Sequence, residues 1–222
     1  MKRIILTVLS TLFLTTSAFA VSIGLSGTAL YYDASGTETT KSSNQKNEKS
    51  ENGVVPMPSL FIENELDTGI VVGIDFVPAS AKAADFDNAR TDTDTDDASD
   101  TAGNNKGDVN FKNLVTLYVE KPLDMAFDGA YVKVGLSRVT IETDETVATG
   151  STYNDEDVTG LTLGFGKKTD LASGAFMKFE GQVSRFQGAT FKGSTDADSV
   201  NNEIVLDDFT TAGIKISVGK SF

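Results

Sequence analysis

The sequence of 222 residues contains no histidine and no cysteine. Without these two residue types the chain cannot form Ser-His or Cys-His nucleophiles, or the imidazole and thiolate sites that usually hold zinc. Disulfides are excluded for the same reason. A carboxylate pair could still cleave glycosides, and Glu63 and Glu65 share one strand face, but pairing with nearby cations explains these two better. We therefore expect neither an enzyme nor a cofactor.

A long apolar segment is also missing. The N-terminus carries Lys2 and Arg3, an apolar run over residues 4–13, and small residues up to Ala20, which is typical of a secretory signal peptide cleaved before Val21. Its apolar core is too short for a spanning helix, and no later run approaches the roughly 20 residues required. The sequence predicts a signal peptide over residues 1–20 and, as argued below, a single β-barrel domain over residues 21–222.

Positive charge is scarce. There are 19 Lys and Arg residues against 32 Asp and Glu residues, so the formal net charge is -13, and loss of Lys2 and Arg3 with the signal peptide makes it -15. A chain this acidic does not favour nucleic acid or an anionic surface.

The remaining chain consists of runs in which apolar and polar residues alternate with the period of a β-strand. In the last nine residues, Ile214, Ile216, Val218 and Phe222 share one face, on which only Lys220 is polar. Its long side chain can reach a membrane interface. The eight alternating runs cover residues 21–33, 60–66, 70–76, 115–120, 132–141, 161–168, 177–184 and 214–222.

The fifth run changes phase. Val132, Val134 and Leu136 lie on one face, whereas Val139 and Ile141 fall on the other. A β-bulge near residues 137–138 would explain the change, because a bulge inserts one extra residue and shifts the alternation.

The connections alternate in length. Short turns at residues 67–69, 122–129 and 170–174 alternate with long polar stretches at residues 34–53, 78–108, 143–157 and 187–202. This pattern predicts an all-β fold, an up-and-down antiparallel eight-stranded transmembrane β-barrel with short periplasmic turns and long extracellular loops.

In combination, the signal peptide, the alternating strands, the alternating connections and the terminal Phe222 resemble the small outer-membrane barrels of the outer-membrane protein A and X type. The resemblance implies a Gram-negative outer-membrane location, contact with outer-membrane lipids, a monomer, and a structural or surface-interaction role. It also implies that the barrel-assembly machinery recognises the C-terminal strand by Ile214, Ile216, Val218 and Phe222.

If the apolar faces contact lipid, the opposite faces place charges of both signs inside the barrel. These residues are Glu63, Glu65, Asp75, Glu120, Lys133, Lys168, Lys178, Glu180 and Lys215. Charges in so narrow a space must pair to offset their desolvation. We expect a salt-bridge network that closes the lumen, and the alternative is a small porin-like channel for ions or small solutes. In a third interpretation, a soluble secreted barrel, the apolar faces would point inward around a ligand.

The second long connection is rich in aspartate, with Asp92, Asp94, Asp96, Asp97 and Asp100 close together. The spacing lacks the glycine and the twelfth-position glutamate of a calcium loop. We expect a solvated acidic loop with only weak binding of divalent cations.

Overall fold

The computed structural model describes residues 20–40, 45–90, 103–123, 127–146, 152–194 and 203–222. Residues 1–19 lie outside this part, so the signal peptide stays a prediction. No helix long and apolar enough to span a bilayer occurs among the described residues.

Nearly all of the described chain is β-strand. The strands are β1 (Ala20–Thr40), β2 (Gln45–Glu65), β3 (Val71–Phe76), β4 (Ala81–Arg90), β5 (Gly103–Pro122), β6 (Ala130–Thr146), β7 (Thr152–Tyr153), β8 (Glu156–Asp170), β9 (Ala175–Phe186), β10 (Ala189–Ser194), β11 (Glu203–Leu206) and β12 (Phe209–Ser221), with one 3₁₀ turn, η1 (Ala172–Gly174).

Eight of these strands form a closed antiparallel ring. Its order is β1, β2, β3, β5, β6, β8, β9 and β12, and β12 pairs back onto β1. Closure is visible at Leu25, which pairs with Leu60 on one side and with Val218 on the other. The predicted eight-stranded antiparallel barrel is confirmed.

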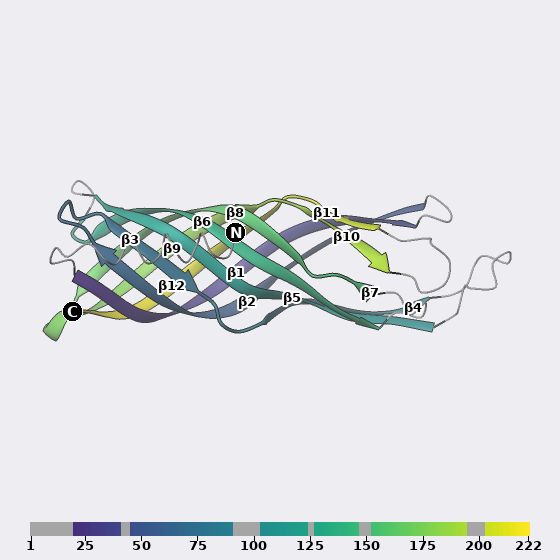
Figure 1. Ribbon diagram of the computed structural model, residues 1–222, viewed down its shortest axis with the longest axis horizontal. Coiled ribbons are helices and arrows are strands. Elements are labelled where there is room, and N and C mark those ends of the chain that lie inside the picture. Colours follow the sequence, from purple (N-terminus) through teal and green to yellow (C-terminus); the bar gives the residue numbers. More distant parts are fainter. Residues whose placement is uncertain (1–19, 41–44, 91–102, 124–126, 147–151, 195–202) are drawn as a thin grey trace.

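The short turns gather at one end of the barrel, together with the C-terminus, at the left of Figure 1. We call this the lower end. The turn at residues 67–69 is closed by the Leu66 N–H, which donates to the Ile70 carbonyl at 2.8 Å. Gly129 ends the next turn at φ 75°, and a Cβ there would lie 2.0 Å from the Lys168 carbonyl oxygen, so only glycine fits.

The long connections are different from the prediction, because much of their length is strand rather than loop. β1 and β2 remain paired up to Thr40 and Gln45, and β4 pairs with β5 over residues 81–90. Figure 1 shows β4, β7, β10 and β11 extending the barrel at its right-hand, upper end. Ladder hydrogen bonds join backbone groups, so a polar sequence can continue a hairpin beyond the membrane.

In the lower part of the barrel the apolar faces point outward. Leu136 is 67% exposed, whereas its neighbours Gly135 and Ser137 point inward. The outward apolar side chains form a belt that includes Ile23, Leu25, Leu60, Leu117, Val119, Val134, Leu136, Leu161, Leu163, Phe165, Phe179, Ile214, Ile216 and Val218. This is the surface expected of a barrel that faces lipid.

The bulge predicted near residues 137–138 is wrong. β6 pairs with β8 without a register shift from Ala130 to Ile141. Val139 and Ile141 are instead buried inside the barrel, at 3% and 4% exposure. The apolar residues change face because the surroundings change along the strand. The bulge of this region lies on β5, where the register with β6 shifts between Lys112 and Val115.

Candidate functional site

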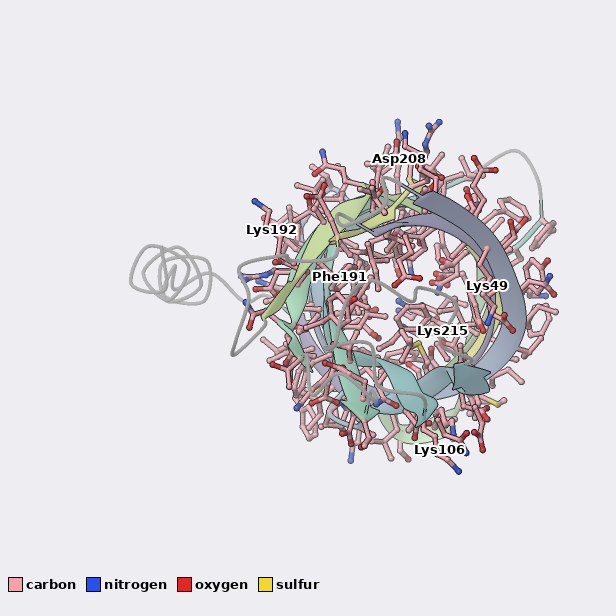
Figure 2. The ribbon with its side chains drawn as sticks, turned by 90° about the vertical axis from the view of Figure 1, so that its right-hand side faces the viewer. Lys49, Lys106, Phe191, Lys192, Asp208 and Lys215 are labelled. Carbon is pink, nitrogen blue, oxygen red and sulfur yellow. The ribbon has the colours of Figure 1, made fainter. Side chains whose placement is uncertain are left out.

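The interior of the lower barrel holds seven buried charged residues. They are Glu63, Asp75, Glu120, Lys133, Lys178, Glu180 and Lys215, which we call the charge layer. They come from β2, β3, β5, β6, β9 and β12, and each is directed inward by the alternation of its strand. Figure 2, a view along the barrel from its upper end, shows Lys215 within the ring.

Lysines hold the carboxylates of this layer together. Lys178 donates to Glu63 and, at 2.6 Å, to Glu120. Lys133 pairs with Glu180, and Lys215 pairs with Asp75. Every carboxylate of the charge layer therefore has a lysine partner, and each pair joins two strands that are not neighbours in the ring.

Two tyrosines complete the layer, and sequence reasoning missed them. The Tyr118 hydroxyl donates to Glu63 at 2.7 Å, and the Tyr131 hydroxyl donates to Glu180 at 2.9 Å. Each ring lies across a glycine of a neighbouring strand. A Cβ at Gly73 would be 2.4 Å from Tyr118 Cζ. An inward tyrosine paired with an inward glycine is the signal that could have identified them.

Two of the nine residues predicted for the lumen network lie apart from it. Glu65 and Lys168 face each other at 3.5 Å near the lower end, with side chains 46% and 27% exposed. Glu65 is the last residue of β2, next to the turn, so solvent reaches it. The prediction that these two join the buried network is corrected to a separate pair at the lower mouth.

A row of hydroxyl groups crosses four strands of the barrel. Thr116, Ser137, Thr162 and Ser184 are linked in this order at 2.8, 2.7 and 2.7 Å. A hydroxyl can both donate and accept, so the two inner members, Ser137 and Thr162, find both partners within the row without a charge.

The upper interior is apolar. Its buried residues form one cluster, here called the upper cluster: Leu30, Tyr32, Val55, Met57, Val77, Ala81, Phe111, Val139, Ile141, Val158, Phe186, Phe191 and Phe209. Phe186 and Phe209 stack with ring centroids 5.0 Å apart, and Phe111 stacks on Phe209 at 6.1 Å. Figure 2 shows Phe191 inside the ring and its neighbour Lys192 outside it.

The outer surface at the upper end of this cluster carries ion pairs. Arg138 pairs with Asp157, and Lys82 pairs with Asp108 at 2.8 Å. The hydrogen bond from Lys112 to Glu142 raises the pKa of that lysine. The upper part is therefore polar outside and apolar inside, which is the reverse of the lower part.

Between the two regions lies a small cavity of about 20 Å³, lined by Thr28, Met57, Asp75, Lys133 and Lys215 among others. This volume is close to that of a single water molecule, for which roughly 10–15 Å³ is the minimum. Side chains of the charge layer and of the upper cluster both line it.

The five aspartates of the predicted cation-binding loop lie outside the described residues, so that expectation stays a prediction. The nearest described acids already have lysine partners: Asp85 and Asp108 face Lys82, and Asp87 faces Lys106.

No protein-family model matches the sequence, and the search of curated proteins returned no match. Solved structures do resemble the fold. The outer membrane protease OmpT from Escherichia coli aligns with a TM-score of 0.51 and 8% identity, over 94% of this chain and 99% of that chain. The outer membrane protein AlkL, solved in lipid bilayers, aligns with a TM-score of 0.53 and 12% identity, over 95% of each chain. The chain thus has the fold of small bacterial outer-membrane β-barrels.

Proposed function

We propose that this protein is an integral barrel of the bacterial outer membrane whose bore is closed, and that its role is structural or lies in surface interactions of its upper end. The observation that carries the proposal is the charge layer, in which seven charged side chains are buried and paired across the bore.

Physical size supports a closed bore. An eight-stranded barrel has an interior just wide enough for side chains to fill. A permeating ion would have to separate pairs such as Lys133–Glu180, and leaving one partner of a buried pair uncompensated costs about 3–5 kcal/mol. The apolar upper cluster adds a second barrier, since none of its members carries a charge that could offset the loss of water around an ion.

The outer surface supports insertion into a membrane. Ile214, Ile216 and Val218 are each about half exposed, and Phe222 is 72% exposed. These are the residues through which we propose that the barrel-assembly machinery recognises the C-terminal strand. The eight paired strands close on themselves within one chain, since β12 pairs with β1, so the barrel needs no second copy to complete its sheet, which supports a monomer.

The residues of this chain do not favour a protease activity such as the one in the name of OmpT. The sequence has no histidine or cysteine to form a nucleophile pair, and the buried carboxylates are engaged by lysines. The competing proposal is a small porin-like channel.

Planar-bilayer recording separates these proposals. The wild-type protein is expected to show no sustained conductance steps. Lys133→Ala removes the partner of Glu180 and is expected to produce intermittent conductance, whereas Lys167→Ala, which changes an exposed lysine on β8, is expected to stay silent. Reproducible conductance steps from the wild type would establish the channel and refute the closed barrel.

A further inference from the structure

The outer face of the barrel is hollowed on one side. On β5, β6 and β8 large side chains lie next to one another across the strands, as Leu117, Leu136 and Leu161 do. Farther round the ring, on β9, β12 and β1, small residues occupy some of the outward positions. These residues are Gly181, Ala212 and Ala29. They form the floor of an open groove of about 730 Å³.

Large apolar side chains flank this floor. Phe165 and Val183 stand on the side of β8 and β9, and Tyr31 and Val54 stand on the side of β1 and β2. Each of these four residues is between 42% and 67% exposed. A Cβ at Gly181 would meet no atom within 4 Å apart from its chain neighbours, so the space above the floor is open. The volume of the groove is in the range of about 300–1,000 Å³ that small-molecule sites have.

The groove climbs from the lower end of the barrel towards its middle. Phe165 lies near the lower end of β8, whereas Tyr31 lies midway along β1. Phe165 pairs with Gly181, and Tyr31 pairs with Ala212, so the register connects the two ends of the groove. The strands of a barrel are tilted by about 35–45°, and a path across neighbouring strands therefore also changes depth. A flexible chain in the groove would run from the periplasmic side of the apolar belt into the membrane.

A lysine lies at the lower end of the groove. Lys167 follows Phe165 on the outer face of β8, and its ammonium lies 5.8 Å from the centre of the Phe127 ring. Phe127 in turn packs edge-on against Phe165, with ring centroids 5.9 Å apart. A second exposed lysine, Lys121, lies across β6, where it pairs with Val132. No ion pair among the described residues includes either lysine, so both charges are available to an anion at the membrane surface.

At the upper end of the groove a cation is already paired. Arg185 follows Val183 on the outer face of β9 and pairs with Asp208 at 3.3 Å. Beside it on β12 lies Thr210, whose partner on β1 is the acidic Asp33. An anionic group is therefore favoured at the lower end of the groove and not at its upper end.

We propose that the groove binds one acyl chain of an anionic glycerophospholipid from the periplasmic leaflet, and that the phosphate of this lipid contacts Lys167. Acyl chains surround the belt at this depth, and a hollow left empty would lose the dispersion contacts of its walls. A second copy of the barrel is convex, so it would bridge the walls without reaching the floor. The lysine makes the site selective for an anionic headgroup, because basic residues at a membrane surface attract anionic lipids.

The test uses two photoprobes that differ only in the headgroup. Phosphatidylglycerol and phosphatidylcholine, each with a diazirine in one acyl chain, are added in trace amounts to phosphatidylcholine bilayers that contain the folded barrel. Mass spectrometry gives the labelling of residues 212–214 in the groove relative to residues 117–119 on β5. This ratio is expected to be about fivefold higher for phosphatidylglycerol, which corresponds to about 1 kcal/mol.

Charge variants locate the headgroup. Lys167→Gln is expected to lower the phosphatidylglycerol ratio to that of phosphatidylcholine. Lys220→Gln, at an exposed lysine of β12 that does not line the groove, is the matched control and is expected to leave the ratio unchanged. An unchanged ratio in Lys167→Gln would refute the phosphate site. A fall in Arg185→Gln alone would place the headgroup at the upper end and would also refute it.

Glycine variants test the groove itself. Gly181→Leu fills the floor, and both lipids are expected to lose their preference for residues 212–214. Gly27→Leu is the matched control, because its Cβ would also meet no atom within 4 Å and it does not line the groove. Equal ratios in these two variants would refute the groove, and so would wild-type labelling of the groove below that of β5, as a second copy seated on it would cause. All the substituted residues lie on the outer face, so the outcomes are independent of conductance, which tests the closed bore.

Discussion

The side chain of Lys178 forms ion pairs with two of the four carboxylates of the charge layer. It donates to Glu63 and Glu120 and lies 5.3 Å from the centre of the Tyr131 ring. No other lysine of the layer has two carboxylate partners among the described ion pairs. Its removal would leave two buried negative charges close together.

Lys178→Met is therefore expected to destabilise the folded barrel by about 3–5 kcal/mol, the usual cost of an uncompensated buried charge. Urea titration in micelles, followed by the mobility difference between folded and unfolded protein on gels, measures this change. Lys167→Met, at an exposed site, is the control.

Neutralising the partners provides a rescue. Lys178→Met combined with Glu63→Gln and Glu120→Gln removes the unpaired charges, and most of the lost stability is expected to return. A triple variant as unstable as Lys178→Met would show that packing of the lysine, and not its charge, is what matters.

The strands of the lower barrel could be predicted from the sequence because the two faces of each strand contact different surroundings. Lipid outside and a polar interior impose strict alternation, as in residues 132–136 of β6. The upper strands could not be predicted in this way. Their interior is apolar and their outer face is aqueous. If every apolar residue is assumed to face lipid, Val139 and Ile141 require a register shift that the strand does not have.

Part of the candidate site was also predictable. Seven of the nine predicted lumen charges are buried together, since alternation alone directs them inward. The positions of Glu65 and Lys168 depend on where a strand ends. The roles of Tyr118 and Tyr131 depend on glycines of neighbouring strands, which lie beside them only once the ring has closed.

Strand β6 offers a test of where the membrane belt ends. Leu136 and Thr140 lie on the same outer face of the strand, but Leu136 is in the apolar belt and Thr140 contacts Asp157 in the region of ion pairs. Leu136→Arg is expected to cost about 2–4 kcal/mol, and Thr140→Arg about 0–1 kcal/mol, because the cost depends on depth. Folding yield into bilayers of defined thickness measures the difference. Equal losses would place both positions in lipid.

At the scale of the whole molecule, one closed ring has two opposite patterns. Its lower part is apolar outside and charged inside, and its upper part has ion pairs outside and stacked aromatic rings inside. The same strands run through both parts, so a single hydrogen-bonded sheet supports both patterns.

Methyl NMR of the native protein in lipid bilayer discs tests this reversal most directly. Val134, Leu136, Val139 and Ile141 all carry methyl groups on one strand, so no substitution is needed. The account predicts cross-relaxation to lipid chain protons for Val134 and Leu136, and to aromatic ring protons for Val139 and Ile141. Lipid contacts at Val139 and Ile141, without aromatic contacts, would contradict it.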